Sequence, residues 1–167
     1  SRAAGALETA GGIANALPLL GAGAFIAVNA VVYSDSGDAG LRDEIVVVGA
    51  HYDHLGPGHF GALDSAGPVH NGADDNASGV AMLLAVAARC QTVPYEHPIV
   101  LAFLDAEEQG LQGARAFIAQ SMAGRPVALN VNFDMVSRSD KKELYVAGPG
   151  RWPLLGPLLQ APASRAS

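Results

Sequence analysis

The chain has 167 residues, of which 50% are hydrophobic and 16% are charged. This composition is typical of a compact α/β protein and excludes an intrinsically disordered chain. The formal net charge of −6, with no cluster of Lys or Arg, leaves nothing for a nucleic acid backbone to bind. The apolar stretch 16–33 is interrupted by Pro18, Gly21 and Gly23, so we expect neither a membrane span nor a membrane partner.

Strands and helices alternate along the chain in the predicted secondary structure. Short apolar runs rich in β-branched residues predict strands, and longer apolar or amphipathic runs predict helices. The expected strands cover residues 25–33, 44–50, 98–106, 126–135 and, with a weaker pattern, 143–148. The expected helices cover residues 7–17, 79–90, 107–122 and 151–160. The alternation predicts an α/β fold of three layers, in which a largely parallel, twisted sheet carries helices on both faces.

The helix expected over 79–90 follows a long loop, 51–75, that is rich in Gly, His and Asp. Asn76 or Ser78 is expected to cap its first turn. The run GVAMLLAVAA is apolar on every side, so we expect this helix to be buried all round.

Ionisable side chains follow the buried strands at the points where those strands end. Because the carboxyl ends of parallel strands lie at one edge of a sheet, and ligands bind there, we expect these side chains to converge. They are His51 after the first buried strand, Asp74 and Asp75 before the next helix, Glu107 and Glu108 after the second strand, and Asp134 after the third. Unpaired carboxylates placed together would repel one another, so this edge is expected to bind a cation.

Imidazole and carboxylate ligands suit Zn²⁺, and a carboxylate that bridges two ions would serve a two-metal site. Taken singly, the same residues have ordinary structural roles. Asp74 or Asp75 could cap a helix, Glu107 and Glu108 could favour a helix start, and Asp134 could belong to a turn. Their joint occurrence at three strand ends favours the metal site.

Four motifs occur in a fixed order: GAHYDHLG at 49–56, NGADDNASG at 71–79, FLDAEEQGLQGA at 103–114 and NFDM at 132–135. In this order and spacing they resemble the di-zinc exopeptidases of metallopeptidase family 28, the leucyl-aminopeptidase-like group. The resemblance covers about residues 44–136 and implies a zinc-exopeptidase-like fold. It also implies that His51, Asp74 and Asp134 bind one zinc ion, and that Asp74 bridges to a second zinc held by Glu108.

The same resemblance implies a function and its catalytic residues. Glu107 would act as the general base of a metal-activated water that removes the N-terminal residue of a peptide with a free N-terminus. Asp53 would accept a hydrogen bond from the ring nitrogen of His51 that does not face the metal. Asp75 would belong to the strained peptide that presents the bridging carboxylate.

One ligand of the family pattern is not found in this chain. The family completes its second zinc site with a His from a later Ser-Asp-His segment, whereas no His follows His97 here. We therefore expect a single domain over 1–167 that lacks its C-terminal strands, with two zinc ions in a complete domain and one in this chain. His59 or His70 is the alternative source of the imidazole, and without either the activity of the chain is in doubt.

Other functions remain open at this point. A single-zinc glutaminyl-cyclase-like acyltransferase and a non-catalytic relative of the same fold have similar sequences, and a carboxypeptidase would need the same ligands. The substrate side-chain preference and the oligomeric state are not indicated. The chain begins without Met, which indicates a processed protein or an excised piece of a longer one. It contains no signal, and we expect a secreted or, in a bacterium, periplasmic location rather than a cytoplasmic one.

Overall fold

The computed structural model describes residues 28–33, 44–56, 69–93 and 95–160, with backbone alone for 28–33. The helix expected over 7–17 and the first residues of the strand expected over 25–33 lie outside these segments, as does His59. The chain divides into two compact units, Ser1–Ser137 and Arg138–Ser167, which are treated separately below.

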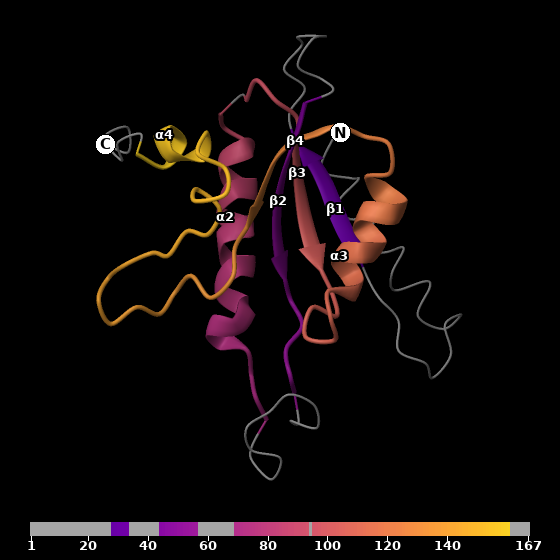
Figure 1. Cartoon of the computed structure of the whole chain (residues 1–167). Helices are drawn as coiled ribbons and strands as arrows, with labels where there is room; N and C mark the ends of the chain where they lie inside the picture. Colours follow the sequence, from indigo (N-terminus) through magenta and orange to yellow (C-terminus); the bar gives the residue numbers. More distant parts are fainter. Residues whose placement is uncertain (1–27, 34–43, 57–68, 94, 161–167) are drawn as a thin grey trace. The chain divides into compact units, whose positions relative to one another are not determined.

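The first unit contains a four-stranded sheet in the order β1-β3-β2-β4 (Figure 1). Its strands are β1 (Val28–Tyr33), β2 (Ile45–His51), β3 (Ile99–Leu104) and β4 (Val127–Asn132). β2 runs parallel to both β3 and β4, and β1 pairs with β3 in the antiparallel direction. The prediction of a largely parallel sheet is therefore confirmed, while the antiparallel direction of β1 is a feature that the hydrophobic pattern did not indicate.

Helices cover both faces of this sheet, as the three-layer prediction requires. α2 (Gly79–Cys90) lies on one side, and α3 (Gln112–Ala116), which continues into the wide turn η3 (Phe117–Ser121), lies on the other (Figure 1). Alternate residues of the strands point to opposite faces. One buried cluster therefore packs beneath Leu83 of α2, and a second packs beneath Phe117 of η3.

The expectation that α2 is buried on every side is wrong. Gly79 and Leu83 are its buried residues, whereas Met82 is 41% exposed and Leu84 is 57% exposed in the described part of the chain. A helix in an outer layer contacts the sheet along one stripe only, so its composition does not decide how far its other side is covered.

The helix expected over 107–122 begins later than the hydrophobic pattern indicated. Residues 107–111 form a turn that ends with Leu111 in the left-handed region, at φ 61°, and α3 starts at Gln112. Gly113 lets this turn fold back onto the end of β3, because a Cβ there would overlap the carbonyl oxygen of Asp105. Glu107 and Glu108 are therefore held in a tight turn at the carboxyl end of β3.

The second unit is described over residues 138–160. It contains the short helix α4 (Leu155–Gln160), within the range expected to be helical, and the Arg151 guanidinium lies 5.8 Å from the centre of the Trp152 ring. Residues 143–148 form no strand, so that prediction is wrong for the described structure. A strand needs a partner for its backbone groups, and none of the described strands pairs with this segment. None of the helices in the described segments is both long and apolar enough to cross a membrane.

Candidate metal centre

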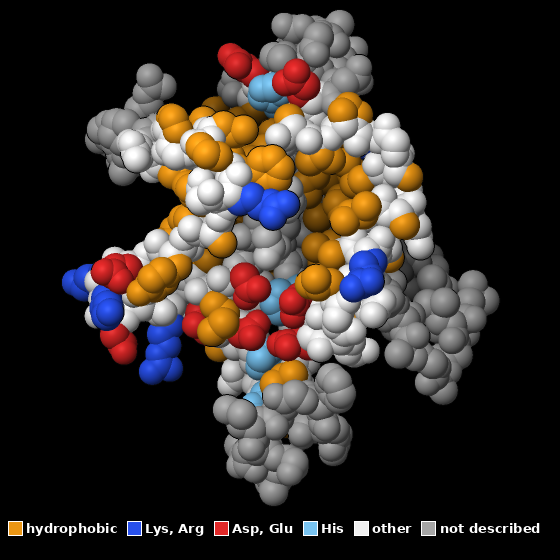
Figure 2. Space-filling model, in the orientation of Figure 1, with side chains coloured by type: hydrophobic (Ala, Val, Ile, Leu, Met, Phe, Trp, Pro, Cys, Tyr) orange, Lys and Arg blue, Asp and Glu red, His pale blue; other side chains and the backbone are white. Residues whose placement is uncertain are grey.

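The register of the parallel strands brings the predicted site residues to one edge of the sheet. His51 is opposite Leu104 at the end of β3, and Gly49 is opposite Asn132 at the end of β4. The segments that follow β3 and β4 therefore leave the sheet beside His51. Acidic side chains gather around histidine rings at this place in the space-filling view (Figure 2).

One group of possible ligands, the His51 group, consists of His51, Asp75 and Asp134. The Nε2 atom of His51 lies 3.2 Å from Oδ1 of Asp75 and 3.6 Å from Oδ1 of Asp134. The His51 ring is only 3% exposed, so the residues packed around it fix the orientation of the imidazole. The Asp134 side chain is more exposed than that of His51, so the His51 group is open to solvent on the side of Asp134.

A second group, the His54 group, consists of His54, Asp75 and Glu108. The Nδ1 atom of His54 lies 2.6 Å from Oε1 of Glu108 and 3.8 Å from Oδ2 of Asp75. Asp75 therefore belongs to both groups and turns one carboxylate oxygen toward each. This is the arrangement expected of a carboxylate that bridges two cations.

Asp74, which we expected to be the bridging ligand, lies outside both groups. Its Oδ1 atom accepts hydrogen bonds from the backbone nitrogen of Ser137 at 3.2 Å and from the Ser137 hydroxyl at 2.6 Å. The neighbouring Asp75 takes its place, because residues 75 and 76 leave the helical conformation and turn the carboxylate of Asp75 toward His51. The Asp75–Asn76 peptide bond is cis. In this structure the second aspartate of the DD pair, and not the first, is the shared member.

Polar residues next to Asp75 attach its loop to the segment after β4. The buried Asn76 side chain donates to the carbonyl oxygen of Phe133 at 2.9 Å and accepts from the backbone nitrogens of Gly79 and Met135 at 3.0 and 3.2 Å. The hydroxyl of Ser78 accepts from the backbone nitrogen of Val136 at 3.1 Å. The sequence indicated Asn76 or Ser78 only as a helix cap, and the link to β4, which holds Asp75 near Asp134, could not be found from local pattern.

We expect Asn76→Ala to lower the free energy of unfolding of the metal-free protein by about 3 kcal/mol. The substitution removes three hydrogen bonds worth about 1 kcal/mol each and leaves backbone groups buried without partners. Urea denaturation in the presence of a chelator measures the difference. Thr92→Ala is the control, because it removes an exposed hydrogen bond from a side chain to a backbone oxygen and should cost about 0.5 kcal/mol or less. Equal losses in the two variants would contradict the role given to Asn76.

Asp53 connects the ends of β2 and β3. Its two carboxylate oxygens accept hydrogen bonds from the backbone nitrogens of Glu107, at 3.0 Å, and Glu108, at 3.2 Å. The Nδ1 atom of His51, the ring nitrogen that points away from the His51 group, forms a hydrogen bond with the backbone carbonyl oxygen of Asp53 at 3.1 Å, and Oδ1 of Asp53 lies 3.5 Å from the same nitrogen. Asp53 is therefore placed to orient both the imidazole and the turn that carries the two glutamates.

Glu107 lies beside the two groups without belonging to either of them. Its partial burial raises the pKa of its carboxyl group, the nearby His51 opposes that shift, and the negative charges of Glu108, Asp134 and Asp53 add to it. A carboxyl group with a raised pKa exchanges a proton more readily near neutral pH than an ordinary glutamate does.

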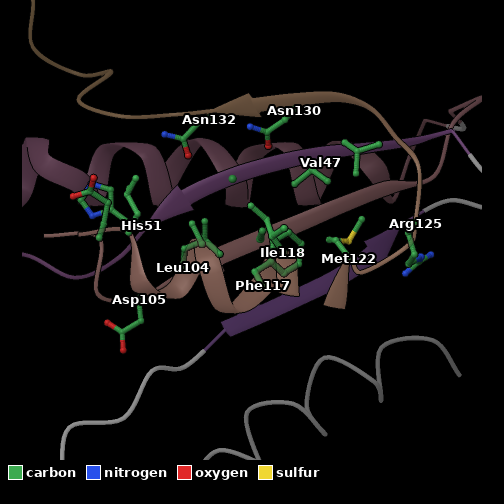
Figure 3. Close-up of a pocket in the computed structure, with 16 residues that line it drawn as sticks. Val47, His51, Leu104, Asp105, Phe117, Ile118, Met122, Arg125, Asn130 and Asn132 are labelled. Atoms are coloured by element: carbon green, nitrogen blue, oxygen red, sulfur yellow. The ribbon is translucent and has the colours of Figure 1, made fainter. Parts of the chain in front are cut away.

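A cavity of about 480 Å³ opens next to His51 and Glu107 and extends along the face of the sheet that carries α3. In the close-up, Asn130 and Asn132 of β4 point into it from one side, and Leu104, Phe117 and Ile118 line the other (Figure 3). Arg125 lies at the end of the cavity opposite His51. The site therefore adjoins a largely apolar space.

Of the two histidines proposed from the sequence as replacement ligands, His70 is described, and it belongs to neither group. His70 donates its backbone nitrogen to the carbonyl oxygen of Gly56 at 2.8 Å, and its Nε2 atom is buried without a hydrogen-bond partner. His59 lies outside the described residues. The imidazole that accompanies Glu108 is that of His54.

The donor atoms of both groups fit a divalent transition metal. Each group combines one imidazole nitrogen with carboxylate oxygens, and all candidate atoms of a group lie within 4.8 Å of one another. Mixed nitrogen and oxygen ligands of this kind suit Zn²⁺. A cation would also neutralise the repulsion among carboxylates held this close together.

Comparison with known proteins gives two findings. Residues 29–167 match the model of peptidase family M28. A segment of 119 residues is 32% identical to a probable lipoprotein aminopeptidase of Mycobacterium tuberculosis, covering 68% of this chain and 20% of the relative. The chain thus spans about a fifth of the length of the curated relative that it matches.

Proposed function

We propose that this chain, which belongs to peptidase family M28, forms the catalytic centre of a zinc-dependent aminopeptidase. The observation that carries the proposal is the position of Asp75, whose two carboxylate oxygens face two separate imidazole-containing groups. Glu107, with its raised pKa, lies beside them. A bridged pair of cations next to a proton acceptor is a common arrangement for hydrolysis.

Each residue has a distinct role in the proposed reaction. His51, Asp75 and Asp134 would hold one cation, and Asp75 with Glu108 would hold the other. When bound, the ions would supply Lewis acidity, which makes water a better nucleophile at neutral pH and polarises the peptide carbonyl group. Glu107 takes a proton from the attacking water at its carboxylate and later gives it to the leaving amine. Asp53 keeps the His51 ring in the orientation that directs Nε2 toward the metal.

Two arguments favour an aminopeptidase over a carboxypeptidase. A free α-amine has a lone pair that can approach one of the cations, so the two-metal centre suits a substrate with an unblocked N-terminus. The relative from Mycobacterium tuberculosis is itself described as a probable aminopeptidase. Because that relative is also described as a lipoprotein, we propose a location outside the cytoplasm for this protein.

A panel of matched peptides tests the proposal. We expect zinc-dependent release of the first residue from a free tetrapeptide, no release after N-terminal acetylation, and unchanged release after C-terminal amidation. Sensitivity to amidation rather than acetylation would indicate a carboxypeptidase. Conversion of an N-terminal Gln to a ring with release of ammonia would indicate the acyltransferase alternative. A zinc-loaded protein that acts on none of these substrates would indicate a non-catalytic relative.

Removal of zinc is expected to lower the melting temperature. The carboxylates of Asp75, Glu108 and Asp134 repel one another when no cation lies between them, and an ion that binds only the folded state stabilises it. At a free zinc concentration of 100 times the dissociation constant, zinc stabilises the folded state by about 2.7 kcal/mol. For a domain of this size, that free energy corresponds to a rise of several degrees in the melting temperature. Calorimetry before and after treatment with a chelator measures the shift. An unchanged melting curve, with metal loss verified by elemental analysis, would argue against the site.

A further inference from the structure

We propose that Tyr52 is a positioning residue for Glu107, and that it acts through the side chain of Asp105. This inference rests on the proposed function, because it concerns the direction in which the proton acceptor of that reaction is held. Neither Tyr52 nor Asp105 belongs to the two ligand groups. The contacts that hold the turn after β3 carry the inference.

The chain makes an unfavourable turn between β3 and Glu107. Ala106 has a positive φ of 52°, in the left-handed region that costs free energy for a residue with a Cβ. Such a conformation persists only where the surrounding structure holds it. Because Ala106 immediately precedes Glu107, its conformation sets the direction in which the glutamate leaves the end of β3.

Asp105 holds this turn from its first residue. Its Oδ1 atom accepts a hydrogen bond from the backbone nitrogen of Ala106 at 2.8 Å, and its carbonyl oxygen accepts from the backbone nitrogen of Gly113 at 2.9 Å. In the close-up, Asp105 lies at the same end of the cavity as His51 (Figure 3). The backbone of Asp105 is thus fixed by Gly113, and the orientation of its carboxylate decides whether Ala106 is held as well.

Tyr52 contacts both the end of β3 and the Asp105 carboxylate. Its backbone nitrogen donates to the carbonyl oxygen of Leu104 at 2.9 Å, which continues the pairing of β2 with β3 by one residue. Its phenol group forms a hydrogen bond with the carboxylate of Asp105. A phenol keeps its proton at neutral pH, so Tyr52 is the donor and Asp105 the acceptor. The same carboxylate therefore joins the Tyr52 hydroxyl to the backbone of Ala106.

Tyr52 and Asp53 hold the turn on opposite sides of Ala106. Asp53 accepts hydrogen bonds from the backbone nitrogens of Glu107 and Glu108, after the left-handed residue. Tyr52 acts through Asp105, before that residue. Loss of the Tyr52 hydroxyl would release the first side only, so the ligand groups should keep their metal while the direction of the Glu107 carboxylate becomes less defined.

The experiment compares Tyr52→Phe with Tyr145→Phe in the whole chain. Both substitutions remove a hydroxyl that is hydrogen-bonded to a carboxylate, but Tyr145 pairs with Glu143 at 3.0 Å on an exposed segment of the second unit. A displacement of about 1 Å can cost about 100-fold in rate, so partial release of Glu107 should lower kcat for an unblocked peptide about 10-fold. We expect KM and zinc content to stay nearly unchanged in Tyr52→Phe, and all three quantities to stay unchanged in Tyr145→Phe.

A second readout does not depend on activity. In the metal-free chain, we expect hydrogen exchange at the backbone amides of Ala106 and Glu107 to become about 5-fold faster in Tyr52→Phe, the factor that corresponds to one typical hydrogen bond. The amides of α2 should keep their rates, which separates a local release of the turn from a general loss of stability. Unchanged exchange at Ala106 and Glu107 would overturn the inference.

Variants of Asp105 show whether Tyr52 acts through this carboxylate. Asp105→Asn keeps an oxygen that can accept from both Tyr52 and Ala106, so its kcat should remain near that of the parent. Asp105→Ala should lower kcat, and adding Tyr52→Phe should lower it no further, because the partner is already absent. Equal effects of Tyr52→Phe in the parent and in Asp105→Ala, or loss of zinc from Tyr52→Phe, would overturn the inference. If the unmodified chain hydrolyses no peptide while exchange at Ala106 and Glu107 is faster in Tyr52→Phe, the proposed function is overturned and the link from Tyr52 to the turn is supported.

Discussion

Glu107→Gln is expected to lower the turnover of an unblocked peptide by about 10² to 10⁴ while leaving the zinc content unchanged. Gln has nearly the same shape as Glu but cannot take a proton from water. Glu107 lies outside both ligand groups, so its replacement should not remove a metal ligand. Its backbone nitrogen is held by Asp53, and this hydrogen bond is kept in the variant.

The control for this prediction is Glu96→Gln, which makes the same chemical change at an exposed residue just before β3, away from the metal centre. It should retain the turnover of the parent protein. Initial rates at saturating peptide, together with elemental analysis of each variant, separate a loss of proton transfer from a loss of metal. Parent-like turnover in a zinc-loaded Glu107→Gln variant would show that another group is the base.

Asp75→Asn is expected to weaken zinc binding at both positions, whereas Asp74→Asn should leave both nearly unchanged. Replacing a group that only supports a ligand typically costs about 10- to 100-fold in affinity, so the loss of a shared ligand should exceed that range. Asn keeps one oxygen but loses the charge and offers an amide nitrogen to one of the two ions. Competition titration against a zinc-binding dye measures both affinities.

The two adjacent aspartates make this a sharp comparison. In Asp74→Asn, the side-chain oxygen that accepts from the backbone nitrogen and hydroxyl of Ser137 can remain in place, so we expect less than about a 10-fold change in zinc affinity. The opposite result, with zinc lost from Asp74→Asn and kept by Asp75→Asn, would restore the assignment that the sequence motif suggested. Urea denaturation of the metal-free variants shows whether either substitution disturbs the fold.

Much of the architecture could be predicted from the sequence because it depends on local pattern. Apolar β-branched runs marked β2, β3 and β4, and the helix expected over 79–90 has those bounds in the structure. The rule that parallel strands end at one edge then predicted that His51, the glutamate turn and Asp134 would meet. Membership of peptidase family M28 was likewise implied by motifs that can be read directly from the chain.

Tertiary structure decided the features that depend on contacts between distant residues. Asp74 and Asp75 are the same residue type in the same loop, so local propensity cannot distinguish them. The distinction comes from hydrogen bonds between Asp74 and Ser137, which is 63 residues away. The approach of His54 to Glu108 likewise depends on Gly72 and on the turn after β3. Local pattern in the sequence predicted that His51, the two glutamates and Asp134 would reach this edge of the sheet. Which carboxylates and imidazoles face one another there depends on long-range hydrogen bonds and close backbone packing, which local pattern does not encode.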